Sequence, residues 1–147
     1  MLVGMSIASI AIGCGGTDGG ETSSLTKAEF SKLAEGICAK ATAKKNASLR
    51  SALKQFSDRT LTEATQESLV VTVALPPIRA MTKELGALDM SSDYEPEVRE
   101  MVDAFSAAVQ RIEKDPRSAL AAGFNNNVFN EAGRLANEFG LKACAQI

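Results

Sequence analysis

The sequence contains no histidine, no tryptophan and only one tyrosine among its 147 residues. Without histidine, the chain lacks the commonest general base, the usual zinc and haem ligand, and the base of Ser-His-Asp and Cys-His catalytic sites. It also lacks the glycine-rich phosphate-binding patterns G-x-x-x-x-G-K and G-x-G-x-x-G. We therefore expect no enzymatic activity, no cofactor and no metal site.

An acidic stretch around residues 89–103 leaves two alternatives open. A pair of carboxylates drawn from it would suffice for glycoside hydrolysis, although acidic residues at a helix start more often interact with the helix dipole. Four residues match positions 1, 3, 5 and 12 of a calcium-binding loop: Asp89, Ser91, Asp93 and Glu100. The glycine required at position 6 is replaced by Tyr94. We expect an ordinary turn here, with Asp93 capping the following helix.

The chain has no excess of positive charge, with 16 basic and 18 acidic residues and a net charge of −2. A nucleic-acid-binding protein is usually basic and carries aromatic residues for stacking, so we expect no nucleic-acid partner. The charge is uneven, however. Residues 27–59 contain eight basic and three acidic residues, so this segment carries +5 and the remainder −7. Five basic residues form one side of the first helix: Lys40, Lys44, Lys45, Arg50 and Lys54. We expect a solvated face, and contact with anionic lipid head groups is the alternative.

The longest hydrophobic run, Leu2–Ile12, is too short to cross a bilayer as a helix, which needs about 20 residues. Its length fits the core of a signal peptide. The run leads into Ala11-Ile12-Gly13-Cys14, which resembles the lipobox of bacterial lipoproteins. The resemblance implies cleavage before Cys14 and attachment of diacylglycerol and fatty acids such as palmitate to it. The sequence departs from the usual pattern by having Ala11 rather than Leu and no basic residue before the run. An ordinary secretory signal is the alternative.

A segment rich in Gly, Ser and Thr follows Cys14 and is unable to form a hydrophobic core. At about 5–6 Å × √n, ten such residues reach on the order of 17 Å. We therefore predict a signal peptide at residues 1–13, a lipidated cysteine and flexible tether at 14–24, and one folded domain at 25–147. This organisation predicts an exported protein anchored to the outer face of the bacterial cell membrane.

Four regions of the domain carry apolar residues at the three- and four-residue spacing of a buried helical stripe. They cover residues 26–56, 60–88, 93–114 and 124–139, and a short helix is predicted from Asp115-Pro116 to Ala122. Short turns between these regions predict an all-α, antiparallel bundle of about four long helices. Gly140 is placed to end the last helix.

The first two helical regions contain the most informative local patterns. Thr26 and Glu29 have the spacing of a capping box, and Thr60 and Glu63 repeat it. The stripe of the first helix includes Leu33 and Cys38, and its weakening near Asn46 fits either one bent helix or two. A kink is expected at Pro76-Pro77, because proline removes a helical hydrogen bond. A strand at residues 70–73 is the alternative, but the sequence offers no second strand.

With Cys14 assigned to lipidation, Cys38 and Cys144 remain as a pair. In an up-down bundle the last helix ends near the start of the first, and the tail beyond Gly140 can fold back to Cys38. For an exported protein, a disulfide is the expected state of such a pair. A redox-active or metal-binding pair is the alternative, but the two cysteines are far apart in sequence and no C-x-x-C is present.

The domain is similar to small helical lipoproteins of the bacterial cell envelope. The resemblance is carried by Leu25–Phe30 followed by Cys38, and by Phe139–Cys144. It implies fold and location and leaves activity open. We expect a membrane-tethered, non-enzymatic binding or scaffold protein whose partner is not evident. The alternative is a carrier of a small apolar ligand, held near the proline kink in a pocket lined by Val73, Ile78 and Phe105.

Overall fold

The computed structural model describes residues 24–56, 60–121 and 128–147, and all regular structure in this part of the chain is helical apart from one isolated bridge between Leu25 and Met90. The predicted all-α fold is confirmed. The elements in chain order are α1 (Lys27–Lys54), α2 (Glu63–Leu69), the π-helix η1 (Val70–Ala74), α3 (Leu75–Gly86), α4 (Glu95–Lys114), α5 (Pro116–Ala121), α6 (Asn130–Phe139) and the 3₁₀ turn η2 (Cys144–Gln146).

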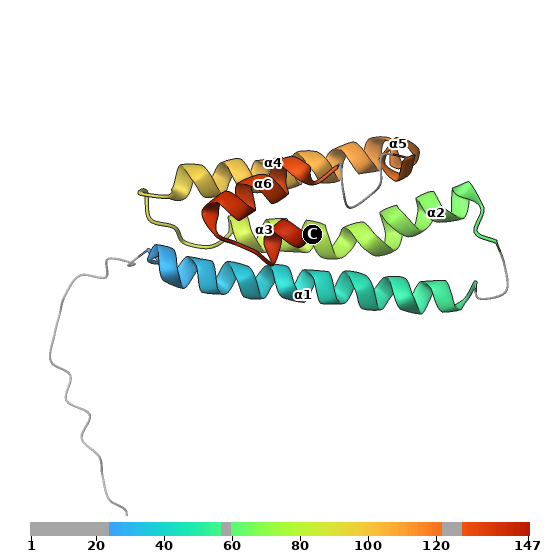
Figure 1. Cartoon of the computed structure of the whole chain (residues 1–147), viewed down its shortest axis with the longest axis horizontal. Coiled ribbons are helices and arrows are strands. Elements are labelled where there is room, and N and C mark those ends of the chain that lie inside the picture. Colours follow the sequence, from blue (N-terminus) through green and yellow to red (C-terminus); the bar gives the residue numbers. More distant parts are fainter. Residues whose placement is uncertain (1–23, 57–59, 122–127) are drawn as a thin grey trace, which may run out of the picture.

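The long helices run back and forth as an antiparallel bundle (Figure 1). α1 forms one outer layer, and α2, η1 and α3 form a second rod that returns beside it. α3 packs against both α1 and α4, while α6 packs against α4 and η2. The core is therefore contributed by the inner sides of α1, α3, α4 and α6 together with the C-terminal residues.

The first helix is a single continuous helix of 28 residues, which settles the alternatives near Asn46. The predicted capping box is present: the Glu29 amide donates to the Thr26 hydroxyl, and the Thr26 amide donates to the Glu29 carboxylate. Phe30, Ala34 and Cys38 are buried, as the stripe predicts. Leu33 is not, because it lies on the outward side of the helix and is 46% exposed.

The kink in the second region takes the form of a π-helical turn directly before the two prolines. The Leu75 amide donates to the Val70 carbonyl, five residues back, instead of four. Pro76 and Pro77 then occupy the first turn of α3, where their missing N–H groups need no partner. The extra residue in the turn thus accommodates both prolines without ending the rod.

Two predicted caps are wrong. α2 begins after Thr62, whose hydroxyl accepts from the Thr65 amide, so the Thr60–Glu63 pattern is out of register by two residues. Asp93 does not cap α4, since α4 begins after Tyr94 without a side-chain cap. The reason is tertiary: the Tyr94 hydroxyl donates to the Leu25 carbonyl at 2.6 Å, and its ring packs against the rings of Phe30 and Phe139.

Two other predicted helix ends are confirmed. The Ser118 amide donates to the Asp115 carboxylate, which caps α5. Gly140 ends α6 in the left-handed conformation, with φ of 95°, and the Leu141 amide then donates to the Ala136 carbonyl. The Leu141 side chain is fully buried. The turn at Gly140 therefore directs the last seven residues back onto the bundle.

Candidate functional site

The disulfide between Cys38 and Cys144 is present, as predicted. It joins the middle of α1 to the C-terminal turn η2 across 106 residues of sequence, with the two Cα atoms 5.0 Å apart. Both cysteines are fully buried in the hydrophobic core. The sulfur atoms are thus removed from solvent, which is typical of a structural rather than a redox-active pair.

The C-terminal segment is also held by Glu35, which sequence reasoning missed. One carboxylate oxygen accepts from the Lys142 amide at 2.6 Å, and the other accepts from the Ala143 amide at 2.7 Å. Glu35 lies almost one helical turn before Cys38, on the side of α1 next to it. A tail that reaches Cys38 must therefore pass close to Glu35, and this proximity was the only signal in the sequence. Its role depends on amides that only the folded tail brings close.

Lys45 is a third link between α1 and the tail. The sequence places it with the exposed basic residues of the first helix, and this is wrong: the side chain is only 4% exposed. Its ammonium group donates to the Ile147 carbonyl at 2.7 Å. Burial lowers the pKa of Lys45 from its ordinary value, because the charged form loses solvation. The hydroxyl of Thr42, one turn earlier, is buried without a partner in the described structure.

An open cleft of about 370 Å³ lies beside the disulfide, between α6 and the C-terminal segment. Its walls include Phe129, Gly133, Arg134, Asn137, Cys144 and Ile147. The Arg134 guanidinium, at the rim of the cleft, donates to the carboxylates of Glu131 and Glu138. Its positive charge is therefore already paired. The cleft thus offers amide and apolar contacts to a small solute but no nucleophile paired with a base.

A second groove, of about 410 Å³, lies at the proline kink between α1 and the second rod. It is open and mixed in character: Ala52, Val73, Pro76 and Pro77 line it together with several polar side chains. Of the three predicted lining residues, only Val73 borders this groove. Ile78 and Phe105 are fully buried in the hydrophobic core. The structure therefore does not bring the three together around one cavity.

The acidic stretch is used for main-chain contacts and ion pairs. The Asp89 and Ser91 carbonyls accept from the amides of Leu25 and Tyr94, respectively. Glu95 pairs with Arg99, and Glu97 lies 3.8 Å from the Lys27 ammonium. Within residues 24–56, 60–121 and 128–147, no group of three acidic or cysteine side chains is arranged to hold a metal ion.

The lipobox, Cys14 and the tether up to Ser23 lie outside the described residues, as does Phe124 of the last predicted helix. Among the helices that are described, none is both long enough and apolar enough to cross a membrane. Comparison with known proteins adds no relative: no family model, no curated protein and no solved structure matches this chain.

Proposed function

We propose that the chain is an exported lipoprotein whose helical domain is anchored through Cys14 to the outer face of the bacterial cell membrane. There it acts as a non-enzymatic binding or scaffold domain. The observation that carries this proposal is the buried disulfide between Cys38 and Cys144. Disulfides persist in oxidising compartments outside the cytoplasm, so the bond supports export.

The disulfide also bears on Cys14. Two of the three cysteines are consumed by the bond, which leaves Cys14 alone. Cys14 follows the only long apolar run of the sequence and precedes a segment too polar to fold. Lipidation gives this remaining cysteine a role, and the domain that follows carries its own core, so the tether need only hold it near the membrane.

Metabolic labelling of the producing bacterium with an alkyne fatty acid tests the proposal. We expect the wild-type chain to be labelled and Cys14→Ala to be unlabelled and released from membranes. Cys144→Ala serves as the matched control, since it also removes one cysteine but should leave labelling unchanged. An unlabelled wild type, or equal labelling of Cys14→Ala, would contradict the proposal.

The groove at the proline kink supports a second candidate function, that of a carrier for a small apolar ligand. Ala52, Val73 and the two prolines supply apolar lining to the groove, and the π-helical turn beside it is a feature often found at functional sites. Mass spectrometry of ligands that co-purify with the native protein tests this candidate. Val73→Asp should abolish a ligand bound there, and Thr72→Asp, which adds the same charge at the polar rim, should reduce its binding less.

A further inference from the structure

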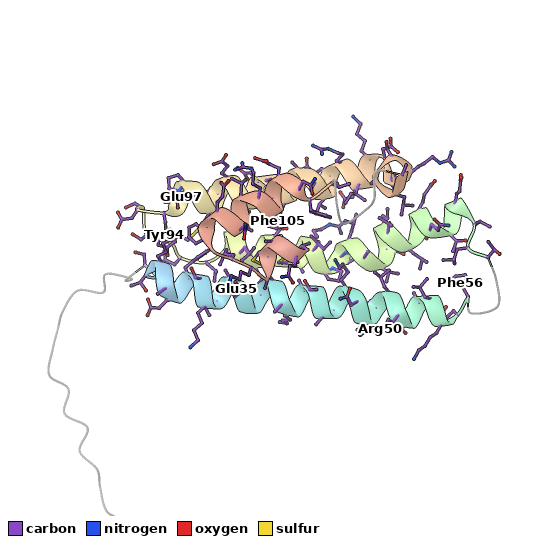
Figure 2. All side chains as sticks on the ribbon, viewed as in Figure 1. Glu35, Arg50, Phe56, Tyr94, Glu97 and Phe105 are labelled. Atoms are coloured by element: carbon purple, nitrogen blue, oxygen red, sulfur yellow. A yellow bond between two sulfur atoms is a disulfide. The ribbon has the colours of Figure 1, made fainter. Side chains whose placement is uncertain are left out.

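The outer side of α1 is a distinct surface of the molecule (Figure 1). The elements packed most extensively against α1 are α3, η1 and η2. They meet its inner stripe, which consists of Phe30, Ala34, Cys38, Ala41 and Lys45. The opposite side is exposed, and Figure 2 shows Arg50 on it, away from the other helices.

Five exposed basic side chains lie on this side of α1 and its flank, and we call them the α1 basic face: Lys32, Lys40, Lys44, Arg50 and Lys54. Lys40 and Lys44 form the edge towards α3, where both border a small groove against Pro77. At 3.6 residues per turn, they fall within about one third of the helix circumference and extend over about 33 Å of its length. None of them has an ion-pair partner in the described part of the chain. The face therefore presents uncompensated positive charge.

The acidic residues of α1 form no ion pair with this face in the described structure. The Glu29 carboxylate accepts from Thr26 at the helix start, and the Glu35 carboxylate accepts from the two tail amides. Elsewhere four exposed arginines are paired with carboxylates: Arg79 with Glu113, Arg99 with Glu95, Arg117 with Glu63 and Glu67, and Arg134 with Glu131 and Glu138. Among the described residues outside α1, the exposed cations without an ion pair are Lys83, Arg111, Lys114 and Lys142, and they are divided among α3, α4 and the C-terminal segment, whereas α1 alone carries five.

The face is also smooth and partly apolar. The exposed residues between the cations are small: Gly36, Ala39, Ala43 and Ala47. The two large apolar side chains that are most exposed in the described structure, Leu33 at 46% and Leu53 at 43%, both belong to α1 and lie at the edges of this face. A long, basic surface with small side chains between its cations and exposed leucines beside them suits an extended anionic plane.

We propose that the α1 basic face docks on the anionic phospholipid head groups of the membrane that holds the anchor. This inference rests on the proposed function, because the lipid on Cys14 would bring α1, the first helix after the tether, within reach of the surface. Basic residues held near an anionic surface each contribute about fivefold to binding. The interaction weakens as salt screens the charges.

Lysine footprinting of the full-length, lipid-anchored protein tests the inference. The protein is reconstituted into vesicles of phosphatidylcholine with or without phosphatidylglycerol, acetylated to low extent, and mapped by mass spectrometry. On anionic vesicles we expect Lys32, Lys40, Lys44 and Lys54 to react about fivefold more slowly, and 1 M salt to remove the effect. Lys114 of α4, which lies in the opposite layer, should react equally on both vesicles (Figure 1).

Two double variants sharpen the test. Lys40→Gln/Arg50→Gln should weaken docking about 25-fold and restore acetylation of Lys32, Lys44 and Lys54. Arg111→Gln/Lys114→Gln removes the same two charge types from α4 and should change nothing.

Each other outcome has one meaning. Equal acetylation on both vesicles would overturn the inference, as would protection seen only in whole cell envelopes, which would indicate a protein partner. The intact mass of the same sample reports the lipid on Cys14 separately, so failure of docking and failure of anchoring are distinguished.

Discussion

At the scale of single residues, Lys45 differs most from its expected role. A lysine that is 4% exposed and bonded to a main-chain carbonyl keeps the tail on α1, but its charge is costly to bury. Its neighbour Lys44 is exposed and shows how small a shift along the helix separates the two environments. Lys45 follows Ala41 by four residues and Cys38 by seven, so it continues the inner stripe of α1, and Lys44 does not.

Lys45 should make stability depend on pH in the alkaline range. Its pKa is lowered in the folded state, so between this pKa and the ordinary value near 10.5 the unfolded chain binds more protons than the folded chain. Stability relative to Lys45→Met should therefore rise with pH in that window, with a slope of at most about 1.4 kcal/mol per pH unit. Urea unfolding from pH 7 to 10 measures this. A difference between wild type and Lys45→Met that does not change with pH would contradict the assignment.

Two glycines provide a second test at this scale, because Gly140 adopts a left-handed conformation that favours glycine and Gly36 adopts a helical conformation that does not. Gly140 has φ of 95°, so Gly140→Ala should destabilise the domain by about 1–2 kcal/mol. Gly36 lies inside α1 with nothing within 4 Å of an added methyl group, so Gly36→Ala should stabilise it by about 0.5–1 kcal/mol. Chemical denaturation of both variants measures the contrast. A Gly140→Ala variant as stable as the wild type would show that the left-handed conformation does not require glycine, and a destabilised Gly36→Ala would contradict the prediction for α1.

At the scale of helices, the ends set by neighbouring residues were predictable and those set by distant residues were not. Thr26, Asp115 and Gly140 act through groups within four residues, so the sequence alone identifies them. The Asp93 cap was wrong because Tyr94 is drawn into the core by Leu25 and Phe139, which are distant in sequence. The Pro76-Pro77 pair predicts a kink, but it does not predict that the turn before it is π-helical.

Removing the cap of α1 should have a pH-dependent effect. Hydrogen bonds from the Thr26 side chain and amide lower the pKa of Glu29, so their contribution is present at neutral pH and is lost as the pH falls through the folded-state pKa. Thr26→Ala should lower the melting temperature by a few degrees at pH 7 and by less near pH 3. Thr62→Ala removes the cap of α2, a short helix with no buried residue, and should lower the melting temperature less. A pH-independent loss for Thr26→Ala would argue against the Glu29 contact.

At the scale of the whole molecule, the disulfide was predictable from two facts: only two cysteines remain after Cys14, and an up-down bundle brings them together. They were not enough to predict that Glu35 and Lys45 hold the same tail, because both contacts use main-chain groups of residues 142–147. Membrane anchoring through Cys14 stays a prediction.

Loss of the disulfide should cost much of the stability of the domain. Opening a loop of 106 residues costs about 4–5 kcal/mol in the chain-entropy model, out of the roughly 5–15 kcal/mol typical of a domain. Because both cysteines are fully buried, we expect Cys38→Ser and Cys144→Ser to be destabilised to a similar extent. Urea unfolding with and without reductant measures the loss. Equal midpoints in the two conditions would show that the bond contributes little.

The disulfide also determines how the molecule would respond to mechanical force. Every helix from α2 to α6 lies between Cys38 and Cys144, so these helices belong to a closed covalent loop. Tension applied between Leu25 and Ile147 would pass through the first turns of α1, the sulfur–sulfur bond and the last three residues. Stretched from these ends, the oxidised chain can lengthen only by unravelling those short segments, and the helices inside the loop carry no load.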